Sequence, residues 1–374
     1  MASISVSRIP LIDAAKGLAC MLIVWHHLAF YGPMSDAAYT LAPGLVDWLY
    51  GYGRMAVQVF LVVGGFLAAG TLAPDGVARY GQPLAQIGRR YLRLATPYLA
   101  ALALAIVAAG VARAWSEHVS IPAMPTLVQL LAHVLLLNDL LGFEALSAGV
   151  WYVAIDFQLF VLAVLVFRLA EGLRGSRPHG GLPERIGIAL VLVLTVLSLM
   201  WFNRQASLDT SALYFAGSYG LGMLAFWAGR SSRRGLWLGV IACLGLLALV
   251  LDYRGRIAVA LVMALGLGWL QSQPGAGRWL LGSWLQRLGQ MSYSVFLVHF
   301  PVCLLVNLLF DQLWPAQPWV NAGGMLLAFA LSLLCGRWLY RGVEQRSASA
   351  TSAWHLSGGL LATGVLVVAT HAFG

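Results

Sequence analysis

Two adjacent histidines, His26 and His27, lie near the end of the apolar stretch KGLACMLIVWHHLAF, which begins with Lys16. A neutral imidazole can act as a general base toward a hydroxyl group. A lysine ammonium is a compact cation that suits an anionic phosphate. Because ionisable groups within a membrane helix usually face a cavity or a partner, these residues predict a reaction site that is reached from one side of a membrane.

The spacing of these residues places two of them on one helix face. Lys16 and His27 are eleven positions apart, which is about 16 Å along a helix and about 20° around it. Asp13 falls within about 40° of His27, and we expect it to pair with Lys16 or to cap the helix beside the site. His26 is rotated by about 100° from His27, so the two cannot face one site equally, and His26 is a candidate to line the site. The alternative is a lysine that extends to the membrane surface and a histidine that bonds a neighbouring helix.

Three arginines, Arg89, Arg90 and Arg93, lie close together at the start of a later apolar run. Guanidinium groups form paired hydrogen bonds with phosphates. The cluster therefore predicts a binding site for a phosphorylated donor. A topology signal or a contact with anionic lipid explains the same cluster, and the roles can coexist.

An acidic residue, Asp156, lies inside another apolar run and follows Trp151 and Tyr152. Tyr152 and Asp156 are four residues apart, so they share a helix face. Asp156 is a candidate to orient a histidine base or a substrate hydroxyl, and the two aromatic residues are candidates to line the site. The competing interpretation is a carboxylate that pairs with an arginine of another helix.

A third histidine, His299, precedes Pro301 in the stretch SYSVFLVHFP, which also contains Tyr293. A proline inside a helix frees a backbone carbonyl, and His299 could bond such a carbonyl. A position in the lining of the site, together with Tyr293, is the alternative.

The rest of the chain must be membrane helices to hold these groups. Of the 374 residues, 60% are hydrophobic and 10% are charged, whereas soluble domains carry about 25% charged residues. We expect an all-α, polytopic bundle with a ten-span core and an eleventh helix at 357–373, forming a single membrane domain over 1–374 with its core at 8–346. The core spans are predicted at 12–31, 55–72, 91–112, 149–170, 185–202, 212–229, 235–251, 254–271, 290–311 and 320–340.

The apolar segment 126–141 is too short for a certain span, and we expect it to be re-entrant or interfacial. With 126–141 outside the count and the N-terminus in the cytoplasm, the inner side collects 18 of the 23 Lys and Arg residues. The outer side then holds only Arg54, Arg113, Arg204, Arg254 and Arg256. Counting 126–141 as a span would spoil this positive-inside bias.

Several function classes lack their signature in the sequence. The positive charges, net +9, lie in short loops between apolar runs, which argues against nucleic acid as a partner. The four cysteines lie inside apolar runs without metal spacing, so no metal is expected. Nucleotide-binding glycine loops, HExxH and GxSxG are also missing.

Six segments resemble the acyltransferase-3 family of integral-membrane acyltransferases. They are LIDAAKGLACMLIVWHH (11–27), AVQVFLVVGGFL (56–67), GRRYLRLATPY (88–98), VWYVAIDFQLF (150–160), LGQMSYSVFLVHFPV (288–302) and YRGVE (340–344). Asp13, Lys16 and His27 match the first family motif, with lysine in place of the usual arginine. In the second segment, 56–67, Gln58 and Gly64 depart from the family pattern, which has an acidic residue and a serine at those positions.

The resemblance implies O-acyl transfer from acyl-CoA, in particular acetyl-CoA, to a carbohydrate or a lipid-linked glycan at a bacterial inner membrane. In this interpretation the donor phosphates bind at Lys16, Arg89, Arg90 and Arg93. His27, oriented by Asp156, removes the proton of the acceptor hydroxyl. Membrane lipids are the only other partners expected, and the oligomeric state is not predicted.

Two other functions stay open from the sequence. A transporter or exporter of a glycan or a small anion also uses intramembrane histidine and aspartate. However, the chain has no matching pair of interrupted halves, which many transporters show. An inactive acyltransferase-like partner of a polysaccharide synthase is the third alternative.

Overall fold

The structure is a computed structural model that describes residues 10–174, 185–273, 275, 282–346 and 348–372. These residues form a succession of helices, with no β-strand among them. Nine helices of the described part are long and apolar enough to cross a membrane. The predicted all-α, polytopic membrane class is therefore confirmed.

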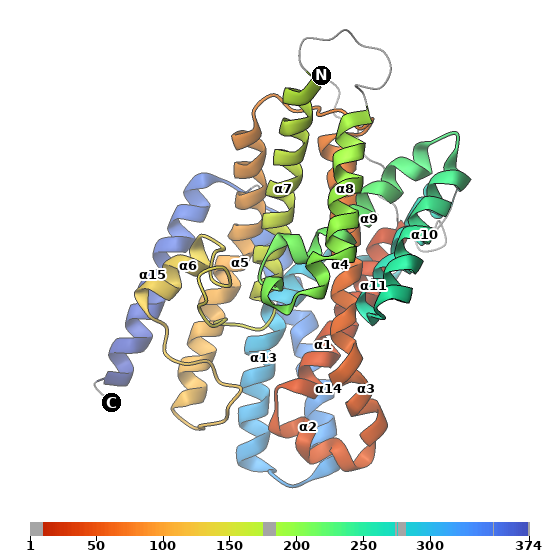
Figure 1. Cartoon of the computed structure of the whole chain (residues 1–374). Coiled ribbons are helices and arrows are strands. Elements are labelled where there is room, and N and C mark those ends of the chain that lie inside the picture. The colour runs from red at the N-terminus through yellow and green to blue at the C-terminus, as the bar shows by residue number, and fades with distance from the viewer. Residues whose placement is uncertain (1–9, 175–184, 274, 276–281, 347, 373–374) are drawn as a thin grey trace. The chain divides into compact units, whose positions relative to one another are not determined.

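The helices follow the chain in the order shown in Figure 1. Their bounds are α1 Pro10–Phe30, α2 Pro33–Ala38, α3 Pro43–Tyr52, α4 Val57–Leu72, α5 Pro83–Arg113, α6 Leu127–Val134, α7 Val150–Arg174, α8 Ile186–Met200, α9 Ala212–Arg230, α10 Arg234–Leu251, α11 Gly255–Leu270, α12 Trp284–Gln290, α13 Ser292–Leu313, α14 Pro318–Leu339 and α15 Ala350–Ala372.

Every predicted span coincides with a helix, and the eleventh helix, α15, begins earlier than predicted. Two of the spans, α9 and α11, are not among the nine apolar candidates. α11 has only 16 residues. α9 has many glycines and polar residues, and it is buried from Tyr214 to Ala228. A helix that is surrounded by protein need not be apolar on every face to stay in a bilayer.

The segment 126–141 contains only the eight-residue helix α6. Eight residues rise about 12 Å, well short of the hydrocarbon thickness of about 30 Å. α6 begins at a capping box, in which Thr126 and Gln129 exchange hydrogen bonds between side chain and backbone. It ends before Leu136, which has a left-handed φ of 57°. The prediction that this segment does not span as a helix is confirmed.

The chain divides into two compact units, each made of separate stretches. Unit 1 comprises 1–16, 55–90 and 155–289, and unit 2 comprises 17–54, 91–154 and 290–374. The helices α1, α5 and α7 contribute to both units. The predicted single membrane domain over 1–374 stays a prediction.

Unit 1 is organised around α9, which packs against α4, α8, α10 and α11. Glycines allow a very close approach between α4 and α9. A Cβ atom on Gly65 would lie 1.9 Å from the Tyr219 carbonyl oxygen, and one on Gly222 would lie 2.0 Å from the Val62 carbonyl oxygen. Small residues let helix backbones meet closely in membranes, where association depends on van der Waals packing.

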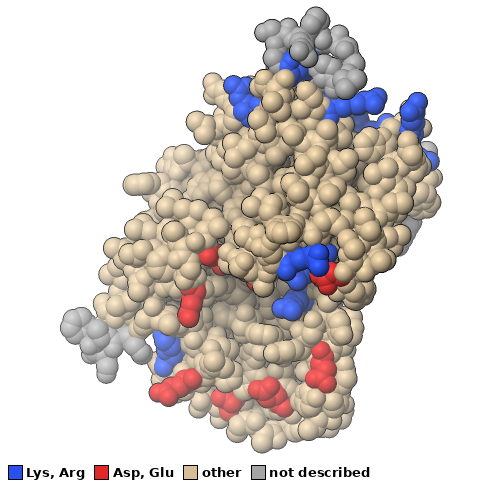
Figure 2. All heavy atoms as spheres, viewed as in Figure 1, with Lys and Arg blue, Asp and Glu red and all other residues tan. Residues whose placement is uncertain are grey.

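Positive charge in unit 1 gathers at one end of its helices. Its arginines cluster at the end of α7 and α9 and at the start of α8 and α10, and Figure 2 shows the corresponding concentration of blue side chains. These residues are Arg168, Arg174, Arg185, Arg230, Arg233 and Arg234. This end is the cytoplasmic side in the topology predicted from the sequence.

Unit 2 is built on the antiparallel pair α13 and α14, and α2 packs against both helices. α15 packs against α6. The turn after α1 is held by Asn307 of α13, whose side-chain amide donates to the Tyr31 carbonyl at 3.0 Å and accepts from the Met34 N–H at 3.2 Å. α2 is therefore tied to the pair by a side chain as well as by packing.

The α4–α9 contact should tolerate no added side chain at Gly65. Gly65→Val introduces a Cβ into the Tyr219 backbone, so we expect the free energy of unfolding to fall by about 3 kcal/mol. Gly239→Ala in α10 is the matched control, because a Cβ there meets no atom within 4 Å. Thermal unfolding in detergent checks both variants, and equal melting temperatures would contradict the packing described.

The buried His133 of α6 predicts a pH-dependent stability. Its Nδ1–H donates to the Gln129 carbonyl at 2.8 Å, and its Nε2 accepts from the Leu146 N–H at 3.3 Å. Burial lowers the pKa of His133 below 6.5, although the Gln129 hydrogen bond raises it. The unfolded chain then binds this proton more readily, so the neutral side chain stabilises the fold above pH 6.5 and the contribution is lost as the pH falls.

His133→Gln should therefore flatten the fall of the melting temperature between about pH 7.5 and pH 5. His355→Gln changes an exposed histidine of α15. Its melting temperature should depend on pH in the same way as that of the unchanged protein. If the melting temperatures of the unchanged protein and of both variants fell equally with pH, His133 would not titrate as described.

Candidate active site

The first helix carries four of the predicted site residues without interruption. Asp13, Lys16, His26 and His27 all belong to α1, as the sequence predicted. In unit 1, the Lys16 ammonium lies 3.3 Å from the Asp13 carboxylate, which is the expected contact one helical turn apart. The carbonyl of Asp13 also lies against Gly289, where a Cβ would approach it to 1.6 Å. Asp13 thus holds Lys16 at a point where the backbone packs closely.

In unit 2, His27 pairs with His299 of α13. The His27 Nδ1 atom lies 2.6 Å from the His299 Nε2 atom, and the two rings are nearly parallel with centroids 4.7 Å apart. His27 is 9% exposed and His299 is 1% exposed. The structure therefore gives each imidazole a buried partner from the other end of the sequence.

The partners of His299 determine where the protons lie. Its Nδ1 is 2.6 Å from the Phe296 carbonyl oxygen, so this nitrogen must carry a proton and donate it. In a neutral imidazole the other nitrogen is then an acceptor. His299 Nε2 accordingly accepts from His27 Nδ1–H, and the lone pair of His27 lies on Nε2. A neutral histidine with this lone pair has the chemistry of a general base.

Aromatic contacts fix the turn of α13 that presents this carbonyl. The Tyr152 ring meets Phe296 edge to face at 5.5 Å, and Trp151 contacts Tyr152 in the same way at 6.3 Å. A Cβ on Gly149, which has a φ of 82°, would lie 2.5 Å from the Phe296 ring. The predicted lining residues Trp151 and Tyr152 thus support the histidine pair through Phe296.

The other predicted lining residues of unit 2 bond the backbone. His26 Nδ1 donates to the Leu49 carbonyl at 2.9 Å, and the Tyr293 hydroxyl donates to the Leu94 carbonyl at 2.9 Å. The His26 ring lies 5.1 Å from the His27 ring. His26 therefore lies beside the base with its Nδ1 proton already committed.

The sequence predicted that His299 bonds a backbone carbonyl near Pro301, but it did not predict which carbonyl. Pro301 lacks an N–H and so leaves the Leu297 carbonyl without its helical donor. The histidine bonds the Phe296 carbonyl instead. Its second bond, to His27, matches the alternative interpretation of His27 as a histidine that bonds a neighbouring helix, although the sequence did not identify His299 as the partner.

In unit 1, Asp156 forms a buried ion pair with Arg90. The Arg90 guanidinium lies 2.5 Å from the Asp156 carboxylate and also stacks over the Phe160 ring at 5.2 Å. The Asp156 side chain is only 5% exposed. This pairing is the alternative interpretation of Asp156 given above. A catalytic role for Asp156 stays a prediction, and the position that orients His27 Nδ1 is taken by His299.

One departure from the family pattern, Gly64, lies beside this ion pair, and the other, Gln58, bonds α9. A Cβ on Gly64 would lie 3.3 Å from an Asp156 carboxylate oxygen and 3.1 Å from the Tyr219 ring. Gln58 accepts a hydrogen bond from the Ser218 hydroxyl at 2.6 Å, one residue before Tyr219. The Tyr219 hydroxyl is buried without a hydrogen-bond partner among the described residues. Tyr219 was missed from the sequence, where it is one of many aromatic residues.

The three arginines at the start of α5 do not act alike. Arg90 turns to Asp156, whereas Arg89 and Arg93 are exposed. Arg89 and Arg93 are four residues apart and so share a helix face. Neither forms an ion pair with a carboxylate in the described part of the chain. Their charges are therefore available, and binding of a donor at Lys16, Arg89, Arg90 and Arg93 stays a prediction.

A metal centre has no counterpart among the side chains that the structure describes. No group of three or more His, Cys, Asp or Glu residues in that part of the chain could hold a metal ion.

Removing one partner of the buried ion pair should be costly. Arg90→Met leaves the Asp156 carboxylate buried and unpaired, so we expect a loss of about 3–5 kcal/mol in the free energy of unfolding. Arg89→Met, at the exposed neighbouring position, should change it by less than about 0.5 kcal/mol. Thermal unfolding in detergent compares the two variants. Equal melting temperatures would show that the Arg90–Asp156 ion pair does not stabilise the fold.

Comparison with known proteins identifies the family. The model of an acyltransferase domain family, acyltransferase 3, matches residues 9–341, which is nearly the whole chain. Searches of curated proteins and of solved structures returned no match. Because the match covers nearly the whole chain and the described helices are apolar enough to cross a membrane, the protein belongs to the acyltransferase-3 family and is a multi-pass membrane acyltransferase.

Proposed function

We propose that the protein moves an acyl group, in particular acetyl, from acyl-CoA to a hydroxyl group of a cell-surface or lipid-linked carbohydrate. His27 is the general base. The family match supports acyl transfer over the transporter alternative. The observation that carries the choice of base is the hydrogen-bond chain from His27 through His299 to the Phe296 carbonyl.

This chain prepares His27 for proton transfer. With Nδ1–H held by His299, the lone pair on Nε2 is available to an acceptor hydroxyl. When Nε2 takes the proton, the positive charge on His27 is stabilised by the hydrogen bond to the neutral His299 nitrogen. The fixed ring orientation also means that little reorganisation is needed at the moment of reaction.

The bond changes follow from this assignment. The hydroxyl oxygen attacks the thioester carbon as His27 Nε2 removes its proton, and a tetrahedral oxyanion forms. Collapse of this oxyanion breaks the C–S bond and yields the ester. The proton then passes from His27 to the coenzyme A thiolate, so the base is restored.

The donor is held by positive charge. The phosphates of coenzyme A need several cations, and Lys16, Arg89 and Arg93 have charges that are not buried in ion pairs with other helices. Arg90 contributes only to the extent that its bond to Asp156 allows. In the topology predicted from the sequence these residues lie on the cytoplasmic side, which supports a donor taken from the cytoplasm across a bacterial inner membrane.

The experiment compares base and orienting residue. In membrane vesicles with radiolabelled acetyl-CoA, we expect His27→Ala to lower label transfer to the glycan fraction by about 10²–10⁴-fold. His299→Asn keeps a donor toward Phe296 but removes the acceptor for His27, so kcat should fall by about 10²-fold with little change in KM. The pH dependence of kcat should also shift in this variant, because the Nδ1 proton of His27 loses its acceptor.

His355→Gln, on the exposed face of α15, is the control and should retain full transfer. Acetyl-CoA should also raise the melting temperature of the purified protein, since a ligand that binds only the folded state stabilises it. Undiminished transfer by His27→Ala would refute the choice of base. Absence of both transfer and thermal stabilisation in the unchanged protein would refute the acyl-CoA donor.

A further inference from the structure

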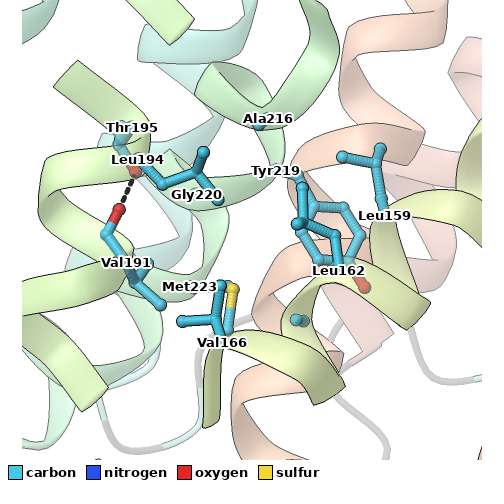
Figure 3. A pocket seen from close by; sticks show the side chains of 11 residues that line it. Leu159, Leu162, Val166, Val191, Leu194, Thr195, Ala216, Tyr219, Gly220 and Met223 are labelled. Atoms are coloured by element: carbon cyan, nitrogen blue, oxygen red, sulfur yellow. Dashed lines mark hydrogen bonds between the residues drawn. The ribbon is translucent and has the colours of Figure 1, made fainter. Parts of the chain in front are cut away.

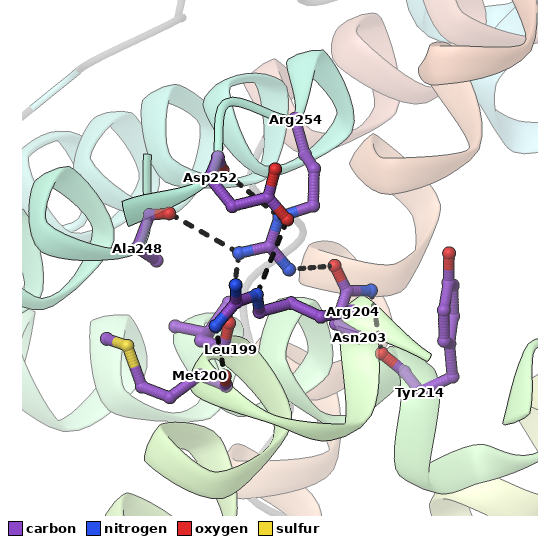
Figure 4. Close-up of polar contacts among 8 residues, drawn as sticks. All are labelled: Leu199, Met200, Asn203, Arg204, Tyr214, Ala248, Asp252 and Arg254. Carbon is purple, nitrogen blue, oxygen red and sulfur yellow. Dashed lines mark hydrogen bonds and ion pairs between the residues drawn. The ribbon is translucent and has the colours of Figure 1, made fainter. Parts of the chain in front are cut away.

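Two polar groups of unit 1 that could attract a ligand already have partners in the chain. Arg254 is buried and donates to the Asn203 side chain at 2.6 Å and to the Leu199 carbonyl at 3.0 Å (Figure 4). In the pocket between α7, α8 and α9, the Thr195 hydroxyl donates to the Val191 carbonyl at 2.7 Å (Figure 3). This pocket offers only about 20 Å³, which is room for about one water molecule. Neither group requires a ligand.

The surroundings of His27 in unit 2 are different. Among the described residues three rings contact it, and the distances between ring centroids are 5.1 Å for His26, 5.4 Å for Tyr31 and 4.7 Å for His299. His26 and His299 each donate an Nδ1 proton to a backbone carbonyl, at 2.9 Å and 2.6 Å. A neutral imidazole has only one N–H, so neither histidine has another proton to donate. The third neighbour, Tyr31, carries a hydroxyl group.

The Tyr31 ring is held in place from several sides. The Tyr31 N–H donates to the His27 carbonyl at 2.9 Å, and the Tyr31 carbonyl accepts from the Asn307 side chain at 3.0 Å. Its ring meets Phe300 of α13 edge to face at 5.1 Å and packs against a buried cluster that includes alanines of α5. The position of this ring is therefore fixed before any ligand binds.

The Tyr31 hydroxyl is left available by these contacts. Its hydrogen bonds to the residues that the structure describes all involve its backbone, and its side chain is only partly buried, so a ligand can reach it. A phenol ordinarily keeps its proton up to about pH 10. At neutral pH a protonated hydroxyl can donate one hydrogen bond. Tyr31 is therefore a neutral donor beside the proposed base.

The proposed reaction needs such a donor close to His27. The attacking oxygen, whose proton goes to His27, and the developing oxyanion are bonded to the same tetrahedral carbon. The base and the oxyanion donor each have to lie about 3 Å from their own oxygen, so the two groups must be neighbours. Tyr31 is one turn, about 6 Å, beyond His27, and helix side chains lean back toward the N-terminus. The ring contact between the two residues agrees with this direction.

We propose that the Tyr31 hydroxyl donates a hydrogen bond to the oxyanion that forms at the thioester carbon. This assignment rests on the proposed function. Tyr31 keeps its proton throughout, so the bonds that form and break are unchanged, and the acceptor's proton still passes through His27 to the coenzyme A thiolate. A hydrogen bond to a charged oxygen is stronger than one to a neutral carbonyl. Tyr31 therefore stabilises the transition state more than the bound substrate.

Two other roles for a tyrosine at this position predict different kinetics. A tyrosine that only anchors a helix at the membrane surface would leave kcat unchanged when its hydroxyl is removed. A tyrosine that binds a sugar hydroxyl equally in the ground state and the transition state would change KM and leave kcat unchanged. An oxyanion donor acts on kcat.

The first test removes the hydroxyl and keeps the ring. In the vesicle assay with acetyl-CoA, Tyr31→Phe should lower kcat by about 10²–10³-fold and leave KM for both substrates unchanged. Tyr50→Phe is the matched control, because Tyr50 is exposed and its ring contacts Phe30 at 4.9 Å, as the Tyr31 ring does. This control should retain full kcat. Equal kcat in the two variants, or a raised KM with unchanged kcat in Tyr31→Phe, would overturn the proposal.

The second test changes the acidity of the hydroxyl and keeps the hydroxyl itself. Replacement of Tyr31 by a difluorotyrosine lowers the pKa of the phenol, and an ionised phenolate cannot donate a hydrogen bond. We expect kcat of this variant to fall at a lower pH than in the unchanged protein. The same replacement at Tyr50 should not move the pH profile. A tyrosine with a purely structural role would not respond to ionisation in this way, so an unmoved profile for the Tyr31 replacement would overturn the proposal.

The melting temperature in detergent shows whether each variant is folded, and His27→Ala separates this proposal from the choice of base. Full transfer by Tyr31→Phe together with loss of transfer by His27→Ala would overturn the oxyanion donor and leave the proposed function intact. Full transfer by His27→Ala together with the expected loss in Tyr31→Phe would refute the base and support the oxyanion donor. Absence of transfer by the unchanged protein would overturn both.

Discussion

A polar side chain inside a membrane helix must find its partner within the protein, because lipid offers none. Two buried pairs meet this constraint: His27 is bonded to His299, and Arg90 is bonded to Asp156. Each arrangement connects stretches that are distant in the sequence. Polar pairing therefore both allows these side chains to be buried and fixes which helices lie side by side within each unit.

The same pairing gives the histidine its chemistry. An imidazole has two nitrogens, and a structure that engages one decides what the other can do. Because the Phe296 carbonyl can only accept, the direction of both hydrogen bonds follows from it. A backbone atom two side chains away thus sets the lone pair on His27. In soluble hydrolases a carboxylate often orients the catalytic histidine. In unit 2 the neutral His299 takes this position, so no negative charge is buried there.

Close backbone contact is the second element of the design. Within unit 1, Gly65 and Gly222 let α4 and α9 meet at distances that a side chain would prevent. The gain comes from van der Waals contact rather than from the hydrophobic effect, which does not drive helices together in lipid. It also explains why α9 is less apolar than its neighbours, since most of its surface touches protein.

The sequence predicted the helices well because hydrophobic length is a strong signal in a membrane. It also located His27, Lys16 and Asp156, since ionisable groups inside apolar runs are conspicuous. It could not decide which partner each group takes, because that depends on the rotation and register of helices far apart in the chain. Asp156 was expected to orient a base, with Arg pairing as the alternative, and it pairs with Arg90.

Other features had no sequence signal at all. Tyr219, which lies beside Asp156 and Gly64, is one of several aromatic residues of α9 and does not stand out among them. The continuous helical stretch from Pro43 to Leu72 was predicted to begin at 55, because α3 has the mixed composition of a loop. These features become visible only when the folded backbone brings separate segments together.

The bond between His27 and His299 has a consequence for biosynthesis. The two residues are 272 positions apart, so the ribosome completes most of the chain before the second imidazole exists. Until α13 has been inserted and has docked against α1 within unit 2, the first histidine has no acceptor for its Nδ1 proton. A nascent chain that has already exposed its first helix to the membrane therefore lacks an oriented His27, and this arrangement forms only once α13 is in place.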